Sequence, residues 1–297
     1  MSTPTTLGYM GGNSLLAGKK QSWLNIFMTY AVIAIIGLVL LMPIIYMFFA
    51  VFKTNEEIFG SIDLLPRQYN FNNFFEGWKS GGKYTYTTYF KNTFLLVFPV
   101  TALTVASSSL VAYGFARFKF PFKKILMVIL ISTLMLPNSV IIIPRYTIFA
   151  KLGWIDTYLP FYVPAIFACF PFFVFMLIQF LRGVPYELDE SAYIDGGGAF
   201  RTLVQILIPI MKPALFSAML FQFIWTYNDY FNPLIFINSV SKYPVSLALR
   251  LSLDSESVVN WGKVMGISFV VASPLIILFF AAQKYFVEGI ATTGLKV

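Results

Sequence analysis

The chain has 297 residues, of which 58% are hydrophobic and only 11% are charged, about half the charged share of a soluble globular domain. This composition excludes a soluble surface, since too few ionic groups remain to cover it, and the bilayer is the expected solvent. The formal net charge of +8 is spread between long apolar runs instead of clustering on one stripe, which excludes a nucleic-acid interface.

The residue types that most often form catalytic and metal sites are rare in this sequence. The sequence contains no histidine and a single cysteine, Cys169. These counts exclude an internal disulfide and a multi-cysteine metal site, and they remove the commonest general base and metal ligand. We therefore expect a chain that is not an enzyme and that holds no metal or cofactor of its own.

Six apolar intervals between charged residues reach the length of about 20 residues that a membrane-spanning helix needs. In chain order they run between Lys20 and Lys53, Lys91 and Arg117, Lys124 and Arg145, Asp156 and Arg182, Lys212 and Lys242 (interrupted only by Asp229), and Lys263 and Lys284. Backbone groups in hydrocarbon must be satisfied within the segment, which favours helices over strands. The sequence predicts an all-α, polytopic membrane helix bundle of about six helices over residues 23–290, with tails at 1–22 and 291–297.

The basic residues indicate the orientation of this bundle. With six spans both termini fall on one side of the membrane, and the total basic count is nearly even between the two sides. The short second connection decides the question, because Arg117, Lys119, Lys123 and Lys124 crowd there without an acid, as the positive-inside rule expects of a cytoplasmic loop. We expect a multi-pass protein of the bacterial cytoplasmic membrane with both termini in the cytoplasm.

The long connection between the fourth and fifth spans, residues 182–212, has a helical pattern of its own. A short helix is predicted from Glu187 to Ile194, because acids in the first turn complement the helix dipole and glycines end it at 196–198. A second helix is predicted from about Phe200 to Ile208. Its apolar face is made by Phe200, Leu203, Val204 and Leu207. This face suits either a groove on a partner or, as an equal alternative, the membrane surface.

Several stretches match a known family. The loop residues Glu190, Ser191, Ala192, Asp195, Gly196, Ile206, Pro209 and Pro213 resemble the EAA loop in permease subunits of binding-protein-dependent ABC importers. The resemblance to MalG-type carbohydrate permeases extends to Leu136, Pro137, Pro144, Tyr146, Leu152 to Thr157, Trp225, Asn228, Pro233, Leu234, Gln283 to Gly289 and Gly294 to Lys296. Ser191 and Gly197 stand where the family has alanine. Both replacements are small, so close approach to a partner is preserved.

The resemblance implies a type I ABC importer permease whose loop couples it to a separate ATPase dimer. In that correspondence Glu190 is the ionic anchor, Ala192 the close-packing contact and Gly196 the turn. The full set of implied coupling residues is Glu187, Glu190, Ser191, Ala192, Asp195, Gly196, Gly197 and Arg201. The C-terminal residues Gly294, Leu295 and Lys296 would make a second ATPase contact.

The partners implied by the resemblance follow from what this chain lacks. The sequence contains no G-x-x-x-x-G-K-[ST] motif, so ATP and magnesium would be bound by the ATPase subunits. A second homologous permease would complete a heterodimeric pore, and an extracytoplasmic solute-binding protein would deliver a carbohydrate, most simply an oligosaccharide.

Asp229 lies near the end of the fifth span, beside Trp225, Tyr227 and Asn228. Ionisable groups inside a membrane are costly, and aromatic faces with amide and carboxylate acceptors suit a sugar, so these four residues are candidates for the substrate path. The competing interpretation places Asp229 at headgroup depth in a structural role.

Two other functions stay open: an ion-driven secondary carrier, although the spans hold no other buried carboxylate, and an importer of a non-sugar solute.

Overall fold

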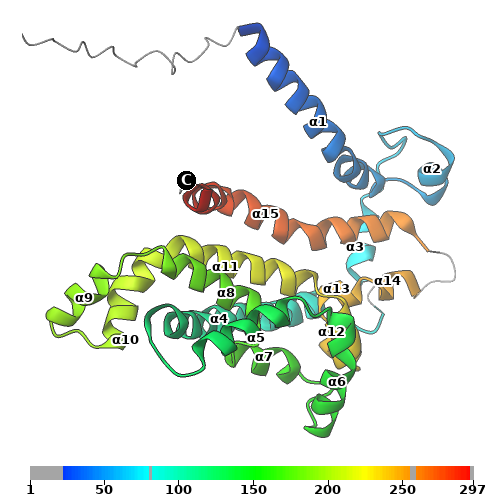
Figure 1. Cartoon of the computed structure of the whole chain (residues 1–297). Helices are drawn as coiled ribbons and strands as arrows, with labels where there is room; N and C mark the ends of the chain where they lie inside the picture. The colour runs from blue at the N-terminus through cyan, green and yellow to red at the C-terminus, as the bar shows by residue number, and fades with distance from the viewer. Residues whose placement is uncertain (1–22, 80–81, 255–258, 295–297) are drawn as a thin grey trace, which may run out of the picture. The chain divides into compact units, whose positions relative to one another are not determined.

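The computed structural model describes residues 23–79, 82–254 and 259–294 of the chain. These residues form helices joined by loops, and no strand occurs among them (Figure 1). The all-α prediction is confirmed. The chain divides into two compact units, residues 1–46 and 47–297. The described part of the first unit is helical and belongs to α1 (Trp23–Ala50), whose end lies in the second unit.

The second unit contains the remaining helices. In chain order they are α2 (Asn55–Gly60), α3 (Asn72–Lys79), α4 (Tyr86–Arg117), α5 (Lys123–Leu134), α6 (Asn138–Lys151), α7 (Leu159–Ile166), α8 (Pro171–Arg182), α9 (Glu187–Ile194), α10 (Ala199–Thr202), a π-helical turn (Leu203–Leu207), α11 (Ile208–Asn228), α12 (Phe231–Phe236), a 3-10 turn (Val240–Lys242), α13 (Val245–Ala248), α14 (Leu251–Asp254) and α15 (Trp261–Gly294).

Five helical stretches in the described residues are long and apolar enough to cross a membrane. They are Trp23–Ala50, Tyr86–Arg117, Leu159–Arg182, Ala199–Asn228 and Trp261–Gln283. A sixth is reached when α5 and α6 count as one broken span, bent by 105°. The predicted third span, 124–145, is therefore not a continuous helix. Pro137 precedes α6, and a proline disfavours helical backbone in the residue before it, which explains the break.

The predicted boundaries of three other spans are wrong, because charges mark where apolar runs stop and not where helices stop. The sixth spanning helix begins at Trp261, so Lys263 lies inside it. The second spanning helix begins at Tyr86, so Lys91 lies inside it. The fifth begins at Ala199 and ends at Asn228, so Lys212 lies inside it and Lys242 lies well beyond it. A helix ends where its backbone groups find other partners, and a long lysine side chain is tolerated near a membrane surface.

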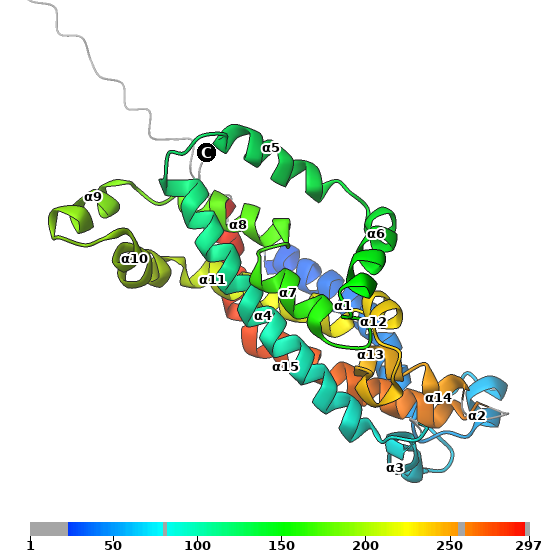
Figure 2. The same cartoon turned by 90° about the horizontal axis from the view of Figure 1, so that it is seen from below.

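α4 is the central helix of the second unit and packs against α7, α8 and α11 (Figures 1 and 2). Small side chains on α4, such as Ser108 and Ala112, are fully buried. Ala112 belongs to the same apolar cluster as Leu177 and Leu181 of α8. Small residues allow helix backbones to approach closely, so this face fixes the packing of α8 against α4.

The functional segments lie at opposite ends of this bundle. α9 and α10 lie at one end, beside the last turn of α4, and α6, α12 and α13 lie toward the other end in both views (Figures 1 and 2). The candidate site therefore has two separate parts: a loop that ends the bundle on one side, and a cavity with a polar rim on the other.

Candidate functional site

α9 begins and ends at the residues predicted for it, Glu187 and Ile194. Its first turn holds the acids Glu187, Asp189 and Glu190, where the helix dipole favours negative charge. At its end the Gly197 N–H donates to the Ala192 carbonyl at 2.8 Å and the Gly196 N–H donates to the Tyr193 carbonyl at 3.0 Å. This pair of bonds is a Schellman motif, which satisfies the free carbonyls of the last turn.

The two glycines of this turn are both required by the backbone. Gly196 has a φ of +77°, in the left-handed region that glycine enters most readily. A Cβ on Gly197 would lie 2.7 Å from the Ala192 carbonyl oxygen. The departure from the family pattern at Gly197 therefore has a local reason: this turn, as it is folded here, has no space for an alanine side chain.

The second predicted loop helix, 200–208, is not a separate element. α10 continues through the π-helical turn Leu203–Leu207 directly into α11. Pro209 follows that turn. A proline in a continuous helix lacks an N–H and clashes with the preceding turn, and the wider π turn accommodates it.

The predicted apolar face is divided between two environments. Leu203 and Leu207 are buried in the core cluster with α4 and α8, whereas Phe200 and Val204 are exposed. The four side chains predicted to form one apolar face therefore do not share one environment, because the start of the fifth span is already packed against the bundle.

The other predicted coupling residues are mostly on the free surface of the loop. Glu187, Glu190, Ser191, Asp195 and Arg201 are exposed. Ala192 is buried, so its side chain packs within the loop and does not face outward. At the tip, the side chains of Tyr193 and Ile194 are 80% and 83% exposed.

A cluster that we call the Arg117 clamp ties this loop to the last turn of α4. Arg117 Nε lies 3.0 Å from Asp189 Oδ2, and the two side chains are only 3% and 18% exposed. Arg117 Nη2 donates to the Val184 carbonyl at 3.1 Å, and its guanidinium lies 4.5 Å from the Tyr186 ring centroid. The Tyr186 hydroxyl donates to the Ala116 carbonyl at 2.6 Å. Burial raises the pKa of the Asp189 carboxyl, and the nearby Arg117 charge opposes that shift.

The clamp was missed by sequence reasoning, which used Arg117 only as an orientation signal and left Asp189 out of the coupling residues. A second tie, from the Tyr113 hydroxyl to the Ala199 carbonyl at 3.0 Å, holds the start of α10 to the same end of α4. The only signal in the sequence is a basic residue that ends a span and an acid in the first turn of the following loop helix. Such residues are common, so their pairing could not be read from the pattern.

A cavity of about 510 Å³ lies toward the opposite end of the bundle. It is lined by Val100, Asn138, Ile141, Arg145, Pro160, Phe161, Cys169, Phe170, Gln222, Ile224, Trp225, Thr226, Asn228, Asp229 and Asn232. Three of the four predicted path residues, Trp225, Asn228 and Asp229, are among them.

Tyr227 is not part of this lining. It is 2% exposed, and its hydroxyl donates to the Val271 carbonyl of α15 at 2.7 Å. Successive residues on a helix point about 100° apart, so neighbours in sequence do not share one face. The prediction for Tyr227 is corrected to a packing role.

Asp229 follows the last residue of α11 and is held by the next helix. Its Oδ1 accepts from the Asn232 backbone N–H at 3.1 Å, and its Oδ2 accepts from the Asn232 side-chain amide at 2.8 Å. The carboxylate therefore has a structural role at the start of α12, as the competing interpretation proposed, and it also lines the cavity.

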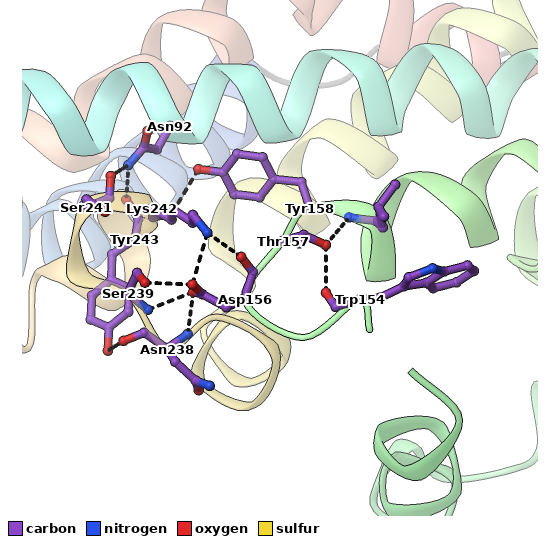
Figure 3. Close-up of polar contacts among 11 residues, drawn as sticks. Asn92, Trp154, Asp156, Thr157, Tyr158, Asn238, Ser239, Ser241, Lys242 and Tyr243 are labelled. Carbon is purple, nitrogen blue, oxygen red and sulfur yellow. Dashed lines mark hydrogen bonds and ion pairs between the residues drawn. The ribbon is translucent and has the colours of Figure 1, made fainter. Parts of the chain in front are cut away.

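The same end of the bundle contains a polar cluster that we call the Asp156 clasp (Figure 3). Asp156 has a φ of +61°, and its carboxylate accepts from the Ser239 hydroxyl at 2.6 Å, the Ser239 N–H at 2.8 Å and the Asn238 N–H at 3.0 Å. Lys242 Nζ lies 2.9 Å from the same carboxylate. Burial raises the pKa of Asp156, but these hydrogen bonds outweigh it and hold the pKa well below its usual value.

The clasp joins three parts of the bundle that are distant in sequence. The Tyr158 hydroxyl donates to the Lys242 carbonyl at 2.9 Å, and the Asn92 amide of α4 donates to the Ser241 and Tyr243 carbonyls at 2.8 and 3.0 Å (Figure 3). The α6–α7 connection, the 3-10 turn and α4 are therefore fixed to one another beside the cavity.

Comparison with known proteins identifies the architecture. The family model described as "Binding-protein-dependent transport system inner membrane component" matches residues 105–291. The chain belongs to this family. It is thus an integral permease component of a binding-protein-dependent transporter.

Named relatives cover nearly the whole permease. This chain is 30% identical over 264 residues to the trehalose/maltose transport system permease protein MalG of Thermococcus litoralis. The match covers 88% of this chain and 94% of that protein. The chain is 29% identical to the arabinooligosaccharides transport system permease protein AraQ of Bacillus subtilis, with 88% and 92% covered. It is also 29% identical to the sn-glycerol-3-phosphate transport system permease protein UgpE of Brucella abortus, with 88% and 94% covered.

A solved structure shares the fold of the permease. A chain of a bacterial ABC transporter involved in the import of the acidic polysaccharide alginate superposes with a TM-score of 0.75, covering 90% of this chain and 98% of that one, at 21% sequence identity. The fold predicted from the sequence, that of an ABC importer permease, is confirmed.

The predicted second ATPase contact, residues 294–296, is described only in part. Gly294 is the last residue of α15, and Leu295 and Lys296 lie outside the described residues.

Proposed function

We propose that this permease imports a carbohydrate, an oligosaccharide, that it receives from an extracytoplasmic solute-binding protein. The names of two relatives, for trehalose and maltose and for arabinooligosaccharides, support this substrate class. The cavity supports it as well, because amides, a carboxylate and the exposed ring of Trp225 converge there. Sites that bind small polar molecules combine apolar surface with a few placed polar groups in this way.

The observation that carries the coupling part of the proposal is the loop around α9. It presents exposed acids and an exposed apolar tip, Tyr193 and Ile194, on a short helix that the Arg117 clamp holds rigidly against α4. An apolar anchor surrounded by charge is suited to a cleft on a partner. We assign that partner as an ABC ATPase dimer, which binds ATP and magnesium, with Glu190 as the ionic contact and residues 294–296 as a second contact.

The clamp gives the loop a way to pass force to the membrane helices. Closure of the ATPase dimer would move α9, and because α9 is fixed to α4 through Arg117 and Asp189, α4 would move with it as a rigid body. With a cytoplasmic ATPase as the partner of the loop, we assign the loop and both chain termini to the cytoplasm. A second, homologous permease completes the pore, and the Asp156 clasp and the cavity lie toward the extracytoplasmic side.

The experiment compares two charge reversals in the reconstituted importer, which contains this chain, its neighbouring permease, the ATPase and the binding protein. Glu190→Lys reverses the proposed ionic contact. Glu56→Lys is the matched control, because Glu56 is equally exposed but lies in α2, away from the loop. ATP hydrolysis is measured with and without sugar-loaded binding protein, together with the amount of ATPase that co-purifies.

We expect loaded binding protein to stimulate hydrolysis in the wild type and in Glu56→Lys. In Glu190→Lys the stimulation should fall by about tenfold or more, the equivalent of 1.4 kcal/mol in the contact, while the chain still inserts in the membrane. If no ATPase co-purifies with the wild type and uptake follows a proton or sodium gradient, the proposal is wrong and an ion-driven carrier takes its place.

A further inference from the structure

Two residues that line the cavity each carry a buried side-chain oxygen that has no hydrogen-bond donor among the described residues. Gln222 is 3% exposed, and its amide nitrogen donates to Thr226 Oγ1 at 2.8 Å. Its Oε1, and Oδ1 of Asn232, accept nothing from the described part of the chain. A buried acceptor without a partner is destabilising, so a ligand whose hydroxyl donors reached these two atoms would relieve both.

Arg145 is a donor of the same cavity that also lacks a strong partner. Among the described residues no carboxylate oxygen lies within 4.0 Å of its nitrogens. It donates weakly to Asn138 Oδ1 at 3.4 Å, and its guanidinium lies 5.7 and 5.5 Å from the Phe149 and Phe236 ring centroids. An arginine within a membrane bundle is costly unless it serves a site or a water-filled path.

The charges of the lining balance. Among the described residues, Arg145 and Asp229 are the two charged ones that line the cavity, so the formal charge of this lining is zero. An uncharged polyol can donate to Asp229, Gln222 and Asn232 and accept from Arg145. A ligand carboxylate or phosphate would gain from Arg145 but would be repelled by Asp229, and that repulsion is strong where water is scarce.

We infer that this cavity is a binding subsite for one ring of an uncharged sugar, and that Asp229 makes it select against acidic sugars. Trp225, which is 48% exposed and lies at the cavity wall, supplies an apolar surface for the ring face. The inference rests on the proposed carbohydrate function and deepens it. Relatives do not decide the charge of the substrate, since one is named for a phosphate ester and the structural neighbour serves an acidic polysaccharide.

The single cysteine of the chain is a built-in reporter of this subsite, because Cys169 is exposed and lines the same cavity. The rate of its alkylation by N-ethylmaleimide is measured in the assembled importer in lipid nanodiscs, by mass spectrometry of this chain. The probes are maltotetraose, cellotetraose and arabinotetraose as neutral sugars and tetragalacturonate as the acidic one, at equal concentrations and without binding protein.

We expect at least one neutral tetrasaccharide to slow the alkylation of Cys169 several-fold and tetragalacturonate to leave it unchanged. Gln222→Met and Trp225→Leu should abolish the protection. Tyr227→Phe is the control: its hydroxyl points to α15 and not into the cavity, so it should keep the protection.

Asp229→Asn gives a gain-of-function test. The amide oxygen can still accept from the Asn232 N–H, so the start of α12 is kept while the cavity becomes positive. Tetragalacturonate should now protect Cys169.

Protection by tetragalacturonate in the wild type, or no protection by any probe, would overturn the inference. Either result is distinguishable from failure of the proposed function, because stimulation of ATP hydrolysis by sugar-loaded binding protein is measured separately.

Discussion

The Arg117 clamp predicts that a single carboxyl-to-amide change, Asp189→Asn, releases the loop around α9 from α4. The substitution keeps the shape of the side chain and leaves the buried Arg117 charge without its ionic partner. Breaking a fully buried ion pair costs about 3–5 kcal/mol. Asp189 is 18% exposed, and Arg117 keeps its bond to the Val184 carbonyl, so we expect the lower figure of about 2 kcal/mol, since water can reach one side of the pair.

A loss of about 2 kcal/mol corresponds to a roughly 30-fold increase in the population of the open loop. Trypsin measures that population when opening is fast relative to cleavage, and it can cleave after the exposed Arg182 and Arg201, which flank the region that opens. The purified permease pair without ATPase is used so that no partner covers the loop. Cleavage of Asp189→Asn should be about 30-fold faster than cleavage of the wild type.

The control for this experiment is Glu187→Gln, which removes a charge from the same helix where the carboxylate is exposed, and which should leave the cleavage rate unchanged. In the complete importer that carries Asp189→Asn, hydrolysis of ATP by the ATPase subunits should respond more weakly to loaded binding protein. If Asp189→Asn is cleaved at the wild-type rate, the ion pair does not hold the loop, and the rigid-body coupling of α9 to α4 loses its basis.

Two further substitutions test the local geometry. Gly197→Ala should lower the free energy of unfolding by about 1 kcal/mol or more, since its Cβ would lie 2.7 Å from the Ala192 carbonyl oxygen. Gly198→Ala, whose Cβ meets open space, should have little effect, and equal thermal stability of the two variants would contradict the assignment. Asp156→Asn should lower the free energy of unfolding by about 1.5 kcal/mol. The loss is smaller than that expected for a fully buried charged network, because Lys242 is 44% exposed. Since the pKa of Asp156 is held below 3.8, its contribution is complete above that pH and is lost only as the pH falls through the lower value. The difference in unfolding temperature between wild type and Asp156→Asn should therefore be the same at pH 7 and pH 5, and a difference that shrinks by pH 5 would show that the carboxylate is not stabilised in the fold.

Elements set by local chemistry could be predicted well. α9 was placed to the residue because its acids and the glycines of its Schellman turn are close neighbours in the chain. The spans were found because each is a continuous apolar run. The predictions failed where packing against a neighbouring helix decides the outcome. The helix predicted to end near Ile208 continues into α11, because the π-helical turn Leu203–Leu207 keeps the chain packed on α4 and α8.

The sequence by itself determined the class of the molecule: a helical membrane bundle, with one loop whose residues resemble a coupling motif. Composition and apolar run length are sufficient for that, since the bilayer accepts very few backbone solutions. Only the tertiary structure decided which charges act together. It brings Arg117 to Asp189 and places Arg145 and Asp229 in one cavity, whereas it turns Tyr227 away toward α15. Such pairings depend on how helices distant in sequence pack against one another, and periodicity within one helix carries no information about the face its neighbour presents.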